Sequence, residues 1–203
     1  CGRLLAQGQW RLWKLGWIWR RGWRLWRRRR LGKVVNMEWS RLLRHLLISE
    51  RAVRKHFPKD SLARIEEHIR QSEKQHSGEI RFAVESGLEL GPLWKGQTPR
   101  ARAIEVFSAL GVWDTENNNG VLVYVMLADH AIEIVADRGI HQKVPTNHWE
   151  SISKSIEHAF RNGQFETGVL EAMATVSATL IEHFPCEAGG GPDELPNQAI
   201  VLG

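Results

Sequence analysis

The amino-acid sequence predicts an α/β protein, a three-layer α/β/α sandwich with a small mixed central sheet and a β-hairpin. The first observation is the unbroken apolar run 121–127, which would place apolar side chains on both faces of a strand. Such a strand belongs inside a sheet that is covered on both sides. The second is a turn at 128–131 followed by alternating Ile132, Ile134 and Ala136, which indicates a hairpin. The third is the order of the elements, because helical segments precede, separate and follow the strands.

The 203-residue chain is long enough for one domain of roughly 150 residues plus extensions. Its composition changes near Met37, where a segment rich in Trp and Arg gives way to an ordinary mixture. We expect a Trp/Arg-rich extension at 1–36, an N-terminal helical segment at 37–57, the α/β domain at 58–184 and a flexible C-terminal tail at 185–203.

Residues 1–36 are interpreted as sequence outside the native chain, or as a disordered extension, and are set apart from fold reasoning. An alternative is a helix that lies on an anionic membrane or on nucleic acid. The Trp residues follow neither a helical nor a strand period for long, and basic residues lie between them on every side. The segment holds six of the ten Trp residues, at positions 10, 13, 17, 19, 23 and 26.

The charge of the two parts also differs. Residues 1–36 contain eleven Lys and Arg and no acid, which leaves 17 bases and 23 acids, a net charge of −6, for residues 37–203. Residues 37–203 are mildly acidic and contain no row of basic residues that could bind the phosphates of a nucleic acid. We therefore expect no nucleic-acid partner for them.

The segment 37–57 contains leucines at helical spacing, with arginines around them. It predicts a short helix that packs on the domain, or alternatively an interfacial anchor. No apolar run of about 18 residues and no signal peptide is seen, so we expect a location in the cytoplasm or peripheral to the inner membrane. Membrane contact is expected only if residues 1–48 are native and interfacial. The leucines are Leu42, Leu43, Leu46 and Leu47.

The domain is predicted to begin with a helix capped by Asp60 that runs to about Gln75. Residues 79–85 then alternate, with Ile80, Phe82 and Val84 inward, and indicate a strand close to an edge with one face in water. After a loop at 86–97, Thr98 and Pro99 are typical of a helix start, and Gly111 ends that helix. The first two strands should be parallel, because a helix connects them.

Two further helices complete the predicted domain. Asn147 and Glu150 suggest a capping box at the start of the first of them, and Gly163 ends it. The last helix is expected from about Glu166 to Phe184, with Val169, Met173, Val176 and Leu180 inward.

Common catalytic patterns are absent, including phosphate-binding glycine loops, nucleophile elbows and paired C-x-x-C. Nine His residues are scattered without metal-ligand spacing, and those on helices are interpreted as solvated. The two Cys residues, Cys1 and Cys186, do not predict a structural disulfide.

Oxygen-bearing side chains are concentrated before the apolar strand and just after the hairpin. In a hairpin the start of the first strand lies beside the end of the second, so Asp137 should approach the loop 114–119. Carboxylate and amide oxygens suit Ca²⁺ or Mg²⁺, while the alternative is that Asn-rich loops merely form turns. The expected metal ligands are Asp114, Asn118, Asn119 and Asp137, with Glu85, Ser86, Glu116 and Asn117 as possible residues of the rim.

The order of these pieces over about 120 residues resembles the TPM domain, the module of YgcG-like proteins and of a plant thylakoid lumen protein. The similarity includes Gly78 before the first strand, Asn119-Gly120 before the apolar strand, and the stretch 134–139. It continues through paired final helices with Phe160, Gly163, Phe165 and Gly168. The resemblance implies an α/β/α domain, in some members a divalent-cation site beside the hairpin, and in the plant branch a weak acid-phosphatase activity.

Three hypotheses for the function follow. The first is a TPM-type module that binds a divalent cation or a protein partner. The second is a weak metal-dependent phosphomonoester hydrolase, in which a cation held by Asp114, Asn118 and Asp137 polarises the phosphoryl oxygen. Glu85 and Ser86 are then the candidates for general base and nucleophile by position. The third is an accessory protein at a membrane surface. Whether the protein is an enzyme stays open.

Overall fold

The computed structural model describes residues 39–186 and 194–203, and residues 39–203 fall within one compact unit. The interpretation of residues 1–36 therefore lies outside the described residues. The described elements are α2 (Trp39–Leu47), α3 (Glu50–His56), α4 (Lys59–Ser72), β1 (Glu79–Glu85), α5 (Leu90–Trp94), α6 (Pro99–Ala109), β2 (Gly120–Met126), β3 (Ala131–Ala136), α7 (Arg138–His141), α8 (Thr146–Arg161), α9 (Phe165–His183) and β4 (Ile200–Leu202).

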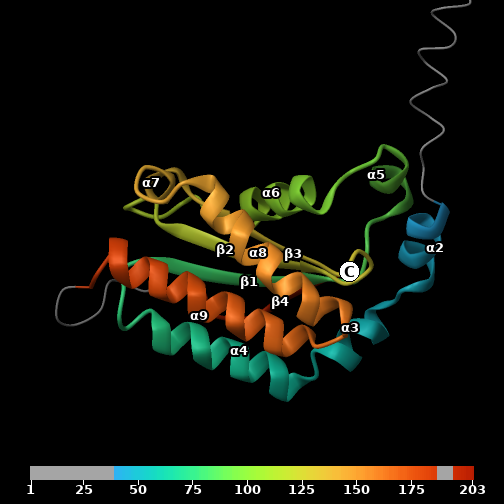
Figure 1. Ribbon diagram of the computed structural model, residues 1–203, viewed down its shortest axis with the longest axis horizontal. Coiled ribbons are helices and arrows are strands. Elements are labelled where there is room, and N and C mark those ends of the chain that lie inside the picture. The colour runs from blue at the N-terminus through green and yellow to red at the C-terminus, as the bar shows by residue number, and fades with distance from the viewer. Residues whose placement is uncertain (1–38, 187–193) are drawn as a thin grey trace, which may run out of the picture. The chain divides into compact units, whose positions relative to one another are not determined.

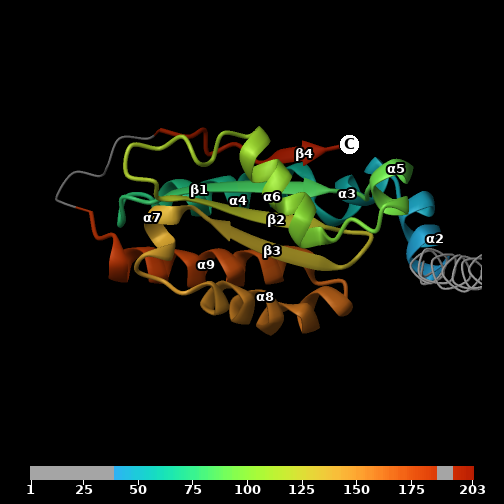
Figure 2. The ribbon, with the colours of Figure 1, turned by 90° about the horizontal axis from the view of Figure 1, so that it is seen from above.

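The four strands form one mixed sheet in the order β3-β2-β1-β4. β1 is parallel to β2 and to β4, whereas β2 and β3 are antiparallel. Helix α6 lies on one side of the sheet, and α4 and α9 lie on the other (Figures 1 and 2). The predicted α/β/α sandwich, its hairpin and its parallel first pair of strands are confirmed.

The hairpin sets the geometry on which the candidate site depends. Its register pairs Met126 with Ala131 at the turn and Val121 with Ala136 at the base. The turn needs one residue in the left-handed region, which His130 supplies with a φ of 51°. The chain therefore reverses at 128–131, as the sequence predicts, and brings the end of β3 back to the start of β2.

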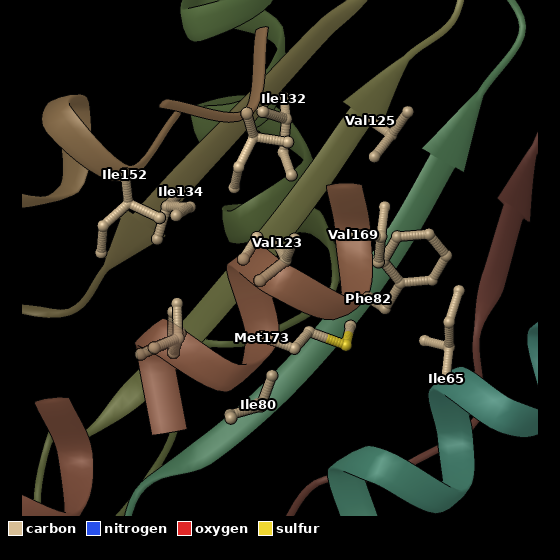
Figure 3. Close-up of a cluster of buried hydrophobic side chains, with 14 of the residues drawn as sticks. Ile65, Ile80, Phe82, Val123, Val125, Ile132, Ile134, Ile152, Val169 and Met173 are labelled. Atoms are coloured by element: carbon tan, nitrogen blue, oxygen red, sulfur yellow. The ribbon is translucent and has the colours of Figure 1, made fainter. Parts of the chain in front are cut away.

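The core lies between the sheet and the helices α4, α8 and α9. Alternate residues of all three long strands point into it, among them Phe82, Val123 and Ile134, each at most 1% exposed. Figure 3 shows Phe82 near Ile65 of α4 and Met173 of α9, and Ile134 beside Ile152 of α8. A strand that is apolar on both faces is covered on both, as expected: Leu122, Tyr124 and Met126 are buried on the opposite side.

β1 is an interior strand, which corrects the prediction of a strand near an edge with one wet face. All seven of its residues are buried, including Glu79, Arg81 and Glu85. The cause is the segment 194–203, which was expected in a flexible tail. Its strand β4 pairs with β1, and the Leu195 amide donates to Glu79 Oε2 at 3.3 Å. The segment 194–203 therefore makes β1 an interior strand, and α6, whose Arg102 binds Glu85, helps to cover a face whose alternation is typical of a wet strand.

Two helix starts also differ from the predictions. Asp60 lies in the first turn of α4 rather than at its N-cap, which is Pro58. The proposed capping box is wrong, because α8 begins at Thr146 after Pro145 and Asn147 lies within the helix. Thr98 is confirmed as a cap, since its Oγ1 accepts from the Ala101 amide at 3.2 Å.

The pair Asn119-Gly120 fastens the start of β2 to its surroundings. The Asn119 side-chain amide donates to the Ser77 carbonyl, and the Asn119 carbonyl accepts from the Glu79 amide at 3.2 Å. At Gly120 the carbonyl oxygen of Val112 lies 2.0 Å from the place where a β-carbon would be. Only glycine permits this approach.

Candidate functional site

The candidate site lies at the base of the hairpin, where β2 begins and β3 ends. The Asp137 amide donates to the Gly120 carbonyl at 2.9 Å, and the Gly139 amide donates to the Asn118 carbonyl at 3.1 Å. The structure therefore brings Asp137 beside the 117–120 loop, as hairpin geometry predicts. Asp137 is 7% exposed, so its carboxylate is largely removed from water.

The two carboxylate oxygens of Asp137 have different surroundings. Oδ1 accepts from the Arg138 amide at 2.6 Å and so caps the short helix α7. Oδ2 is buried and makes no hydrogen bond to the described residues. Since a buried carboxylate oxygen without a partner is costly, this atom is the natural place for a donor or a cation to bind.

Two backbone carbonyls converge on the same corner. A β-carbon at Gly139 would lie 2.6 Å from the Asn118 oxygen and 2.7 Å from the Asn117 oxygen. The absence of a side chain at Gly139 thus lets both oxygens come close to the start of α7. Carbonyl oxygens beside a carboxylate are ligands of the kind that Ca²⁺ uses.

The amide side chains of the loop are already engaged. Asn118, with a φ of 51°, accepts at Oδ1 from Arg138 Nε at 2.8 Å. Asn119 points towards Ser77 and the start of β1, where its amide group donates. The predicted ligand pair of Asn118 and Asn119 thus serves to hold the loop, although Asn119 Oδ1 is buried without a hydrogen-bond partner among the described residues.

The acidic residues earlier in the loop are exposed. The Asp114 amide closes a turn on the Gly111 carbonyl, and the Glu116 amide donates to Glu194 Oε2 at 2.9 Å. Among the described residues, Asp114 and Asp137 share no hydrogen-bond partner. Within residues 39–186 and 194–203, no group of three or more His, Cys, Asp or Glu side chains is arranged to hold a metal ion.

Glu85 and Ser86 lie at the other end of the sheet, which corrects their placement at this rim. Glu79 pairs with Gly120 beside the site, whereas Glu85 pairs with Met126. Six residues along a strand separate them by roughly 20 Å. Glu85 accepts from Arg102 through two hydrogen bonds of 2.9 Å and from the Tyr124 hydroxyl. Burial, followed by this bond to Glu85, raises the pKa of Tyr124.

Sequence reasoning missed a second polar cluster, at the tip of the hairpin. We call Arg41, Arg44, His45 and Asp129 the Asp129 cluster. Arg41 donates to both carboxylate oxygens of Asp129 at 2.9 and 2.7 Å, and His45 Nε2 lies 3.1 Å from Oδ1. His45 is 6% exposed, so its interpretation as a solvated histidine is wrong. Burial opposes ionisation of Asp129, but hydrogen bonds from Arg41 and His45 outweigh it and lower its pKa.

A pocket of about 650 Å³ opens beside this tip, along β3 and α8. Its lining contains both signs of charge: Glu133, Glu150 and Glu157 face Arg100 and Lys154. Burial raises the pKa of Glu133, and the pairing with Arg100 reduces the shift. The helical spacing of 150, 154, 157 and 161 places the α8 residues on one face, which is a sequence signal for this lining.

Together, the mixed four-stranded sheet, the covering helices and the loop at the hairpin base define an α/β/α module. The model of the TPM domain matches residues 54–179. Because this match covers more than half of the chain, the chain belongs to the TPM domain family, as its sequence resemblance implies.

Two solved structures are similar to this chain. The BA42 protein of the psychrophilic bacterium Bizionia argentinensis is 31% identical, with a TM-score of 0.61, over 70% of this chain and 93% of that one. The N-terminal domain of a protein from P. gingivalis is 18% identical, with a TM-score of 0.48, over 58% of this chain and 72% of that one. No curated protein matches.

Proposed function

We propose that this TPM domain is a module that binds a divalent cation at the hairpin base through Asp137 and the 117–119 loop. The observation that carries the proposal is Asp137 Oδ2, a buried carboxylate oxygen without a hydrogen-bond partner in the described residues. Asp137 lies two residues before Gly139, on which the Asn117 and Asn118 carbonyls converge. A hard cation would satisfy Asp137 Oδ2 and would take these carbonyls as further oxygen ligands, that of Asn118 in addition to the hydrogen bond it accepts from the Gly139 amide.

The chemistry of the donors favours Ca²⁺ or Mg²⁺ and weak binding. One carboxylate supplies a single negative charge, and Arg138, which donates to Asn118 at the same corner, opposes a cation. Ca²⁺ sites with few charged ligands have dissociation constants of about 10⁻⁴–10⁻³ M. The chain's own contribution is to hold the loop rigidly, through Gly139 and the Arg138–Asn118 hydrogen bond.

A protein partner at this rim is the related possibility, because a donor from another chain could also satisfy Asp137 Oδ2. No observation favours the alternative of a metal-dependent phosphomonoester hydrolase. Its expected base, Glu85, lies at the far end of β1 and is held by Arg102 and Tyr124. We therefore rank hydrolysis below binding.

The test is a titration of the full chain with CaCl₂ and separately with MgCl₂, followed by NMR. Saturable shifts of the amides of 117–120 and 137–139 in the millimolar range are expected. Shifts elsewhere, or no saturable shift, would reject the site. Hydrolysis of p-nitrophenyl phosphate in the same samples checks the alternative: cation-dependent turnover that is lost with Asp137→Asn would favour the hydrolase.

Two matched variants test which carboxylate binds the cation. Asp137→Asn keeps the cap on α7 in shape but removes the charge, and should weaken Ca²⁺ binding about tenfold, because a lost charged contact costs on the order of 1–2 kcal/mol. Asp114→Asn, in the exposed part of the loop, should change the affinity less than twofold, roughly the limit set for screened surface charges. The reverse order of the two effects would show that the exposed loop, rather than Asp137, holds the ion.

A further inference from the structure

The helix α2 presents its apolar side to solvent. Trp39, Leu43, Leu46 and Leu47 are 68%, 54%, 52% and 81% exposed, respectively. At 100° per residue these four positions lie within about 100° of one another on the helix. A helix that only packs on a domain would turn such a stripe inward.

The opposite side of α2 is polar and faces the body of the domain. Arg41 and His45 point to Asp129 at the tip of the hairpin, and Arg44 Nε donates to the Ala128 carbonyl at 3.1 Å. Of the apolar residues of α2, only Leu42 is buried. The Asp129 cluster therefore holds an amphipathic helix in the inverted orientation, with its polar face inside.

A second apolar element is tied to the same helix. The Leu88 amide donates to His45 Nδ1 at 2.9 Å, and Arg41 Nη2 donates to the Gln97 carbonyl at 2.8 Å. These two hydrogen bonds attach both ends of the α5-containing loop to helix α2. Helix α5 is seen beside α2 in Figures 1 and 2. On α5, Leu90 and Trp94 are 57% and 63% exposed.

We define the outer face as Trp39, Leu43, Leu46, Leu47, Leu90 and Trp94. Folded domains rarely expose contiguous apolar patches larger than a few hundred Å² unless the patch binds something. The charge around it is positive on balance: α2 contains no acid and Arg44 is 48% exposed, while Glu50 of α3 and Glu89 before α5 are exposed acids. The other exposed bases of α3 and of the residue after α5 are Arg51, Arg54, Lys55 and Lys95.

We propose that the outer face docks on an anionic lipid bilayer. Two exposed tryptophans with leucines and flanking bases are the composition of a surface that lies in the headgroup region, where the indole rings and arginines reach the polar layer. No helix of the described residues is long and apolar enough to cross a bilayer, so the contact would be at its surface. The cation site at the other end of the hairpin is not needed for this docking.

The test is co-sedimentation of the full chain with vesicles of equal parts phosphatidylcholine and phosphatidylglycerol, compared with vesicles of phosphatidylcholine alone. We expect binding to the anionic vesicles that high salt weakens. Leu43→Gln with Leu47→Gln should lower the partition coefficient about tenfold or more, because two leucine side chains would no longer leave water. The matched control is Ile104→Gln with Ile181→Gln, two exposed apolar residues on α6 and α9, which should leave it unchanged.

Hydrogen exchange with mass spectrometry assigns the contact to the outer face rather than to the Trp/Arg-rich residues 1–36. Anionic vesicles should slow exchange in peptides that cover α2 and α5. Protection confined to residues before 39 would overturn the proposal, as would equal binding of the variant and the control. A dimer in sedimentation velocity that the Leu43→Gln/Leu47→Gln variant abolishes, without vesicle binding, would show that a second copy covers this face and would also overturn it.

Discussion

His76 shows how a single residue can make stability depend on pH. It lies in the turn between α4 and β1, is 1% exposed, and its backbone forms a bridge with Pro185. Burial lowers the pKa of His76 from 6.5 to about 4, although backbone contacts at Gly78 and at His76 itself partly offset the shift. The folded state thus keeps His76 neutral at pH values where the unfolded chain binds a proton.

The sign of the effect follows from proton linkage. Between about pH 6.5 and pH 4 the unfolded state binds more protons than the folded state, so the free energy of unfolding falls as the pH falls through this window. The loss amounts to roughly 3–4 kcal/mol at about 1.4 kcal/mol per pKa unit. His76→Phe should flatten this dependence in urea unfolding, whereas His158→Gln, at an exposed position, should not. If the free energy of unfolding depended equally on pH in His76→Phe and in the parent chain, this prediction would be contradicted.

The same residue marks a limit of prediction from sequence. His76 has polar neighbours in the sequence and His45 follows Arg44 on a helix with several arginines, which is typical of solvated positions, yet both are buried. Their burial depends on the hairpin tip and on residue 185, which are more than 80 residues away in the sequence. Asp137 could be placed beside the 117–120 loop because a hairpin imposes that proximity. The role of Asn119 as a clamp on Ser77 could not, because it depends on which strand lies next to β2.

At the scale of elements, the Asp129 cluster fastens α2 to the hairpin tip. The side chains of Arg41 and Asp129 are 21% and 9% exposed, so their pairing is partly shielded from water. The pKa of Asp129 is lower in the folded state than in the unfolded chain. The ionised Asp129 side chain therefore stabilises the fold at pH values above its unfolded-state pKa, and this stabilisation is lost as the pH falls through its folded-state pKa.

Asp129→Asn should release α2 without unfolding the sheet. Removing one partner of a fully buried pair costs about 3–5 kcal/mol, and partial exposure reduces this to about 2 kcal/mol here. Hydrogen exchange of the α2 amides should accelerate about thirtyfold, because 1.4 kcal/mol corresponds to a factor of ten. Asp60→Asn, on the exposed start of α4, is the control. Unchanged exchange in α2 would mean that Leu42 and the backbone hold the helix.

The long periodic elements could be predicted from sequence, and the short or non-local ones could not. β2, β3, α4 and α8 have the strong apolar patterns that local side-chain spacing imposes. Helices of four or five residues, such as α5 and α7, show no period. β4 is three residues long and exists through its pairing with β1, so the edge position expected for β1 was wrong.

For the molecule as a whole, the segment of helix α3 and Phe57 shares one core with the α/β domain. Phe57 is 1% exposed, and its ring lies 5.8 Å from that of Phe82 and 6.4 Å from that of Phe165. Val53 of α3 is equally buried. The predicted boundary near residue 57 thus falls inside the compact unit of residues 39–203.

Phe57→Ala should therefore destabilise the entire domain, by about 3–5 kcal/mol, the usual cost of removing a buried phenylalanine ring. The loss should appear equally in far-UV circular dichroism and in tryptophan fluorescence during urea unfolding, because one cooperative unit unfolds. Leu43→Ala, which truncates an exposed side chain, should change the stability by less than about 0.5 kcal/mol. Separate transitions for the two probes would instead indicate an independent N-terminal segment.

The approach of the Val112 carbonyl to Gly120 limits which residues can replace Gly120 during evolution. Where a carbonyl oxygen occupies the volume of a methyl group, even alanine requires the backbone to move. A library that randomises position 120 and selects for folded protein should return glycine alone, and adjacent Asn119 should tolerate few replacements because its side chain binds the Ser77 carbonyl ahead of β1. Glycine at position 120 is then explained by steric necessity, whatever the protein binds.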